Sequence, residues 1–161
     1  MGVTHAKSIG CSIGECFEMS RQFGSTLAVL GVAAIDGSAV EANRNGTLYF
    51  ESTDCSGPPL INTGETHALF SDTIQYRGTK IYYADLSAGA TTHGFASSED
   101  TGFVASSQAD CDSNYGPGHS QFLPPDRCCT SAGPGALSFC PAVLVDLASL
   151  GFVPPFHIDG P

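Results

Sequence analysis

The sequence predicts a mostly β protein: a single antiparallel β-sandwich or open barrel with long loops that disulfide bonds staple together. Three observations support this prediction. The 161 residues include 19 glycines and 10 prolines but only 14% charged residues, a composition typical of turn-rich β proteins. Short apolar segments alternate with turn signals, and no long helical pattern is present. Seven cysteines are dispersed without a C-x-x-C pair, which favours a disulfide framework.

The length of the chain suits one domain with its own hydrophobic core. We divide it into an N-terminal lead with a close cysteine pair, residues 1–24, and a β domain, residues 25–161. Within the lead, residues 16–23 are expected to form one or two helical turns. The near-continuous apolar run at residues 27–35 predicts a strand that is buried on both faces or covered by another subunit.

Turn signals divide the middle of the chain into short strands. Asp36-Gly37 and Asn45-Gly46 are expected turns around a returning strand at residues 38–43. Alternating aromatic residues predict a strand at residues 47–53, which Pro58-Pro59 would end because proline cannot donate to a ladder. A short strand is also expected at residues 68–70.

The clearest hairpin is predicted around Arg77-Gly78, between strands at residues 73–76 and 79–84. Because side chains alternate along a strand, Ile74 and Tyr76 should share one face, and Ile81 and Tyr83 should share one face of the returning strand.

The segment at residues 86–135 is expected to be loop-like, with weak strands at residues 93–97 and 102–106. A long irregular segment in a compact domain is commonly functional or cross-linked, and disulfides would explain this one. Residues 142–150 are expected to form a strand or a short helix, followed by an extended segment at residues 151–156.

Most cysteines are expected to be oxidised, in about three disulfides. Because seven is odd, at least one thiol must be free or bonded to another chain. Cys128 and Cys129 should point in opposite directions in a strand and therefore have two different partners. Cys11 and Cys16 are predicted to pair with each other, and a zinc site is the less favoured alternative for the C-terminal cysteines. The seven disulfide candidates are Cys11, Cys16, Cys55, Cys111, Cys128, Cys129 and Cys140.

The charge of the chain limits its partners and its compartment. A formal net charge of −10 repels nucleic acid and anionic membrane surfaces. The longest apolar run is too short for a membrane span, and the first twenty residues contain no apolar signal-peptide region. Disulfides persist in oxidising spaces, so we expect an extracellular, cell-surface or virion protein. A phage structural protein that is released by lysis would fit.

No catalytic motif is present, and neither a catalytic residue nor a cofactor is assigned. Asp110, Asp112 and Asn114 resemble the start of a calcium loop, but the following residues depart from that pattern, and an Asx-rich turn is favoured.

Three tyrosines, Tyr49, Tyr82 and Tyr115, are candidates for a sugar-binding face. Cross-strand packing in a half-buried sheet is the favoured alternative for them.

The apolar strand also predicts self-assembly into a homo-oligomer or polymer. An added strand from a neighbouring copy would cover its exposed face. The interface candidates are Leu27, Val29, Leu30 and Val32.

Two stretches, residues 48–61 with the element Ser52-Thr-Asp-Cys-Ser-Gly57 and residues 145–156 with a Pro-Pro-Phe tail, resemble β-rich modules of bacterial extracellular and phage-tail-like proteins. The resemblance covers under a fifth of the chain. It implies display or assembly rather than catalysis.

The function that we favour is therefore that of a structural or adhesive extracellular or virion subunit, which self-assembles, forms filaments or binds a surface ligand such as a glycan. The alternatives are a secreted hydrolase with a site at residues 86–135 and a carbohydrate-binding module.

Overall fold

The computed structural model describes residues 7–11, 14–24, 26–33, 40–41, 46–62, 71–76 and 80–150. These residues form a mostly β fold, which confirms the predicted class. The strands are β1 (Lys7–Cys11), β2 (Gly14–Phe23), β3 (Thr26–Ala33), β4 (Val40–Glu41), β5 (Thr47–Phe50), β6 (Leu60–Asn62), β7 (Ser71–Gln75), β8 (Lys80–Ala84), β9 (Thr91–Asp100), β10 (Ser120–Leu123) and β11 (Arg127–Asp146). The helices are α1 (Gln108–Tyr115) and the 3₁₀ turns η2 (Leu86–Ala88) and η3 (Leu147–Leu150).

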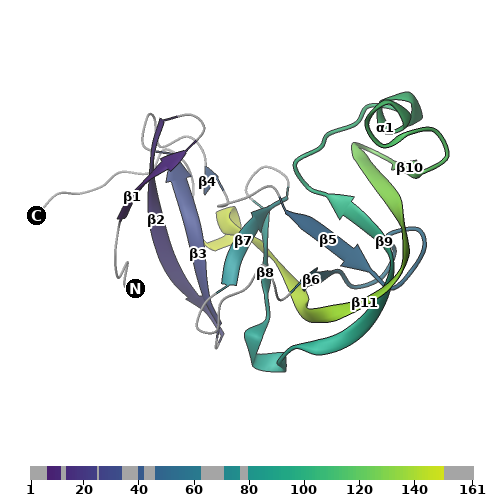
Figure 1. Ribbon diagram of the computed structural model, residues 1–161. Helices are drawn as coiled ribbons and strands as arrows, with labels where there is room; N and C mark the ends of the chain where they lie inside the picture. Colours follow the sequence, from purple (N-terminus) through teal and green to yellow (C-terminus); the bar gives the residue numbers. More distant parts are fainter. Residues whose placement is uncertain are drawn as a thin grey trace, which may run out of the picture.

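The strands follow the order β1-β2-β3-β7-β8-β11-β6-β5-β9. Their pairings are antiparallel except that of β3 with β7, which is parallel. Because β9 also pairs with β11, the strands β11, β6, β5 and β9 form a closed ring. Figure 1 shows this curved part beside the layer of β1, β2 and β3, with β7 and β8 between them. The architecture is thus the predicted sandwich-like β fold.

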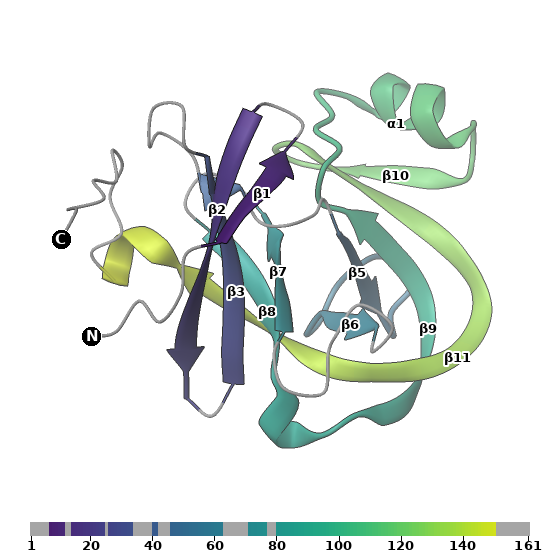
Figure 2. The ribbon, with the colours of Figure 1, turned by 60° about the vertical axis from the view of Figure 1, so that its left-hand side comes forward.

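The 20-residue strand β11 connects the two parts of the molecule. Its residues 129–139 pair with β9, residues 139–141 pair with β6, and residues 142–146 pair with β8. Figure 2 shows how β11 and β9 bend together around β5 and β6. Because β11 changes partners along its length, this one strand pairs both with the strands of the closed ring and with β8.

The predicted hairpin is confirmed as β7 and β8, with Ile74 opposite Tyr82. Ile74, Tyr76 and Tyr82 belong to the main core, whereas Ile81 packs in a second core with Leu147. Strand β8 is therefore covered on both faces, as expected of a strand between two layers. The buried main core consists of Leu48, Phe50, Cys55, Ile61, Ile74, Ala84, Cys129 and Cys140.

Two disulfides cross-link the described residues, Cys55–Cys129 and Cys111–Cys128. The neighbouring cysteines thus have different partners, as the alternation of side chains along a strand predicts. Cys140 is a free thiol and is buried in the main core. A buried thiol is a poor candidate for a bond to another chain.

Cys11 and Cys16 are predicted to pair with each other, but their side chains are not among those that the structure describes. Their backbones are placed: Cys11 lies opposite Gly14, and Cys16 lies opposite Ile9 in the β1–β2 pair. The pairing stays a prediction. So do the expected turns at Asp36-Gly37 and Arg77-Gly78, the strand at residues 68–70 and the segment at residues 151–156, which lie outside the described residues.

Two local predictions are wrong. Residues 16–23 are not helical but belong to β2, which pairs with β3 over eight residue pairs. Residues 86–135 are not mainly loop but contain β9, α1, β10 and the start of β11; the strand expected at residues 93–97 is confirmed as part of β9, whereas residues 102–106 do not form a strand. The sequence of β9 has few β-branched residues, and its pairing with β5 on one edge and β11 on the other overrides that weak propensity.

No helix in the described part of the chain is long and apolar enough to cross a membrane.

Candidate functional site

Helix α1 and the segments around it form a small lobe with its own core. Ala105, Cys111 and Cys128 are buried there, and Phe103, Tyr115 and Phe122 pack against them. The Cys111–Cys128 disulfide fastens the helix to the start of β11. We call this unit the α1 lobe.

The ends of α1 are well defined. At its start, the backbone N–H of Asp110 donates to the Ser107 hydroxyl at 3.3 Å, as in an N-cap. At its end, the N–H of Gly116 donates to the Asp112 carbonyl at 2.9 Å. Gly116 has a φ of 90°, a conformation that favours glycine. An eight-residue helix that is capped and cross-linked is a rigid wall for a site.

The Gln108 side chain holds α1 against β10. Its Nε2 donates to the Asp112 carboxylate at 2.8 Å and to the Ser120 carbonyl at 2.9 Å. Its Oε1 accepts from the backbone N–H of Phe122 at 2.8 Å. One side chain thus satisfies polar groups of both elements and fixes the spacing between them.

An open groove of about 460 Å³ lies along the α1 lobe. Its volume is within the range of small-molecule sites, roughly 300–1,000 Å³. It combines apolar side chains with a few polar ones, and the Val104 side chain is 63% exposed there. We call it the α1 groove. Its lining residues are Phe103, Val104, Ala105, Ser106, Asp110, Ser113 and Asn114.

The charged group of the α1 groove is the Asp110 carboxylate. It accepts from the Ser106 hydroxyl at 2.6 Å and from the Ser106 backbone N–H at 2.7 Å. These hydrogen bonds lower the pKa of the Asp110 carboxyl, so that it is ionised at neutral pH. The groove therefore presents one fixed negative charge beside an apolar surface.

The three candidate calcium ligands lie on α1 rather than in a loop, so the expected Asx-rich turn is wrong. Side chains two residues apart on a helix point about 200° apart. Asp110 and Asn114 accordingly line the α1 groove, whereas Asp112 accepts from Gln108. Among the described residues, no cluster of three or more His, Cys, Asp or Glu side chains could hold a metal ion.

The three candidate tyrosines lie on different elements: Tyr49 on β5, Tyr82 on β8 and Tyr115 at the end of α1. Each packs against other aromatic rings, with centroid distances of 5.1 to 5.5 Å; the partners are Phe95 and Phe139 for Tyr49, Tyr76 for Tyr82 and Phe103 for Tyr115. Burial raises the pKa of Tyr82 and of Tyr115. The rings therefore contribute to three separate packing clusters, and only Tyr115 contacts a residue of the α1 groove.

The interface candidates lie on β3, whose two edges are already occupied. Val32 lies opposite Phe17 of β2 on one edge and Val40 of β4 on the other, and β7 pairs farther along at Ala28 and Val29. Strands of the same chain thus lie along both edges of β3, and the predicted contact between copies at this strand stays a prediction. Leu27 is exposed and Val29 is half-buried, whereas the side chains of Leu30 and Val32 are outside the described ones.

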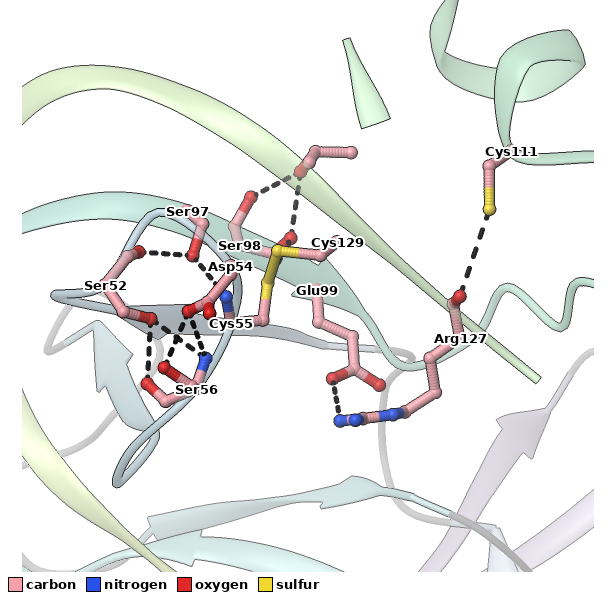
Figure 3. The surroundings of a disulfide bond; sticks show 11 residues. Ser52, Asp54, Cys55, Ser56, Ser97, Ser98, Glu99, Cys111, Arg127 and Cys129 are labelled. Atoms are coloured by element: carbon pink, nitrogen blue, oxygen red, sulfur yellow. Dashed lines mark hydrogen bonds and ion pairs between the residues drawn. A yellow bond between two sulfur atoms is a disulfide. The ribbon is translucent and has the colours of Figure 1, made fainter. Parts of the chain in front are cut away.

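A buried ion pair, which no sequence pattern indicated, lies in the curved part of the fold. Glu99 of β9 lies opposite Leu48 of β5 on one side and opposite Cys129 of β11 on the other, and its side chain is 1% exposed. Its Oε2 is 3.0 Å from Nη1 of Arg127, which is two residues from Cys129 on the same face of β11 (Figure 3). The pair neutralises a carboxylate that would otherwise be costly to bury.

A second polar cluster joins β9 to the end of β5. The His93 Nδ1 lies 2.7 Å from Oε1 of Glu51, and its Nε2 is hydrogen-bonded to the Thr91 hydroxyl. Thr91 and His93 share a face because they are two residues apart on β9. We call these three residues the hydroxyl–imidazole–carboxylate cluster. The sequence shows only a T-x-H pattern, because Glu51 is 42 residues away.

The Ser52–Gly57 element that supports the family resemblance forms a hydrogen-bonded turn around Cys55 (Figure 3). The Ser56 hydroxyl donates to Asp54 at 2.6 Å and lowers the pKa of that carboxyl. The backbone N–H of Cys55, which has a φ of 54°, donates to the Ser97 hydroxyl at 3.0 Å. The Pro-Pro-Phe tail lies outside the described residues, and the resemblance stays a prediction. The chain matches no protein-family model, no curated protein and no solved structure.

Proposed function

We propose that the chain is a structural or adhesive extracellular or virion subunit that binds a surface ligand in the α1 groove. The observation on which this rests is the groove itself, which combines an exposed apolar surface with a carboxylate on a lobe that a disulfide holds rigid. A rigid site loses little conformational freedom on binding, which favours affinity. The two disulfides support an oxidising compartment.

The chemistry of the α1 groove favours a neutral or amine-bearing glycan. Sugar rings present C–H faces to apolar side chains such as Val104 and hydroxyl groups to polar ones. Asp110, Ser113 and Asn114 supply the acceptors and donors that would fix the orientation of the ring. The Asp110 charge and the net charge of −10 disfavour sialylated and sulfated glycans.

A glycan array with the intact protein tests this proposal, with binding to a neutral or amino glycan as the expected result. Val104→Ser should weaken that binding about tenfold, a change of about 1.4 kcal/mol. The matched control is Leu144→Ser, since Leu144 is also exposed but lies on β11, opposite Tyr82 of β8. Absence of glycan binding, or equal weakening by both substitutions, would contradict the role of the groove.

Self-assembly is the second part of the proposal. Among the described strands β1 ends the strand order and pairs only with β2, so its outer edge is where a strand of another copy could add. Native mass spectrometry should show oligomers. Val29→Asp places a charge on β3, within the same layer and not at the β1 edge itself, and should shift the oligomers toward monomers because it disturbs the layer that carries this edge. A stable wild-type monomer at high concentration, or normal assembly of the variant, argues for a monomeric binding module.

The alternative of a secreted hydrolase is supported by one observation. The hydroxyl–imidazole–carboxylate cluster contains a base and a hydroxyl in contact, and Thr91 and His93 lie within residues 86–135. An active-site probe that labels Thr91 and turns over would favour this alternative.

A further inference from the structure

The hydroxyl–imidazole–carboxylate cluster has the connectivity of an activated nucleophile. One imidazole nitrogen of His93 contacts the Thr91 hydroxyl, and the other contacts the Glu51 carboxylate. The carboxylate favours the tautomer with a proton on Nδ1, which leaves Nε2 free to accept the hydroxyl proton. In general, a general base in contact with a hydroxyl makes that hydroxyl a better nucleophile than one without such a contact.

The cluster is open to reagents from solution. Thr91 is exposed, His93 is partly exposed, and the Glu51 side chain is 63% exposed. Leu137 lies directly opposite His93 on β11 and is 42% exposed. An apolar side chain beside the nucleophile offers a contact for the acyl chain of a donor.

We propose that Thr91 is an acyl-acceptor site, which takes an acyl group from an uncharged activated ester with His93 as general base. This modification site goes beyond ligand binding in the α1 groove and does not depend on it. The net charge of −10 disfavours polyanionic acyl donors, so the class of donor is a neutral ester with a good leaving group.

The reaction balances without an oxidant or a cofactor. The Thr91 oxygen attacks the ester carbonyl while its proton passes to Nε2 of His93. The bond between the acyl carbon and the leaving-group oxygen then breaks, and the leaving group departs as an alcohol or phenol with the proton from His93. The product is an ester on Thr91, and Glu51 stabilises the transient imidazolium.

The test uses the full chain and p-nitrophenyl acetate, with release of p-nitrophenol followed by absorbance and the acetylated residue identified by peptide mass mapping. One acetyl group is expected on Thr91. Labelling of this residue should disappear in concentrated urea, because the unfolded chain lacks the contact with His93. Acetylation of lysines or histidines alone, with Thr91 unmodified, would overturn the proposal.

Variants distinguish the effect of the Thr91–His93 contact from the effect of solvent exposure alone. Thr91→Val should abolish the label and Thr91→Ser should retain it, whereas Thr92→Val, at the neighbouring exposed position, should leave it unchanged. His93→Gln should lower the labelling rate about 100-fold, within the usual contribution of a general base. Glu51→Gln should lower it less, because water screens an exposed carboxylate.

His119→Gln is the matched control for a histidine in another part of the fold, the turn between α1 and β10. The proposal fails if His93→Gln and His119→Gln have equal effects, or if Thr91→Val is labelled at the wild-type rate.

Discussion

At the scale of single residues, stability depends on a few titratable groups that are buried, either in an ion pair or in their neutral form. Glu99 and Arg127 are the clearest case, since the carboxylate has almost no exposure and lies between apolar neighbours in the sheet. Cys140 is a second case, a thiol that is kept neutral in the main core. Each makes a different prediction about stability.

Arg127→Ala should lower the free energy of unfolding by about 3–5 kcal/mol, because it leaves the Glu99 carboxylate buried without its cation. The double variant Glu99→Leu with Arg127→Leu should lose less, since no charge is left in the core. Urea unfolding measures both. Glu51→Gln, in an exposed pair, is the control and should change stability by under about 1 kcal/mol. An Arg127→Ala effect as small as this control would show that the ion pair is not buried in solution.

Stability should fall at alkaline pH, because burial raises the pKa of the Cys140 thiol. The folded state then holds the proton more tightly than the unfolded state. The free energy of unfolding is thus unaffected below the pKa of the unfolded thiol and falls as the pH rises from there through the raised pKa. Tyr82 and Tyr115 act in the same direction above about pH 10.

Urea unfolding at a series of pH values measures this fall, and Cys140→Ala should flatten the curve at pH values above about 8.5, the usual pKa of an unfolded thiol. Identical curves for the variant and the wild type would show that the Cys140 thiol does not contribute to the loss of stability at alkaline pH.

At the scale of elements, the curvature of the sheet depends on how β9 and β11 pair. Three residues of β11, 132–134, lie opposite one residue of β9 between the pairs Ser131–Ser97 and Gly135–Phe95. Such a bulge bends the strands and increases their twist. The bend lets β11 leave the closed ring and continue alongside β8.

Gly135→Ala should destabilise the protein by about 1–3 kcal/mol, as overpacking of a filled site does. A Cβ at this position would lie 2.7 Å from Cε1 of Phe95, whose ring packs against Tyr49 and Phe139 and cannot easily move. Gly133→Ala is the matched control, since its Cβ would meet nothing within 4 Å. Thermal unfolding compares the two, and equal melting temperatures would contradict this packing.

The two disulfides should differ in how much each contributes to the free energy of unfolding. Removing Cys111–Cys128 by a double alanine substitution should cost about 3 kcal/mol, and removing Cys55–Cys129 about 4.5 kcal/mol, because the longer bridge spans 74 residues rather than 17. Urea unfolding of the unreduced proteins measures this difference. A variant without Cys111 and Cys128 that keeps full stability would show that this bridge does not form.

The sequence allowed some elements to be predicted because their signals are local. The β7–β8 hairpin has alternating apolar residues on both strands, and adjacent Cys128 and Cys129 imply two partners by alternation alone. By contrast, Gly133-Pro134-Gly135 is a turn signal within a continuous strand. It marks the bulge, and only the pairing with β9 makes the segment extended.

The candidate sites were harder to predict because they depend on residues distant in sequence. Two of the candidate calcium ligands, Asp110 and Asn114, line the α1 groove, but through a helical spacing that differs from the alternate spacing of the prediction. Glu51 meets His93 only because β5 and β9 pair in one register. No local pattern encodes such a register.

At the scale of the whole molecule, the closed ring and the α1 lobe provide a rigid support, and the layer of β1, β2 and β3 provides a sheet edge. The α1 groove lies on the support, and the edge strand β1 is available for contacts between copies. This arrangement is compatible with the proposed function, that of a protein that is displayed on a surface and binds a ligand.

The measurement that tests the central claim most directly is an NMR titration of the isotopically labelled protein with the best neutral or amino glycan from the array. We expect amide shifts that saturate and are confined to residues 103–106, 110, 113 and 114, which line the groove, and to their immediate neighbours in the chain. Shifts confined to other elements, or none at glycan concentrations that saturate the array, would contradict the assignment of the α1 groove as the ligand site.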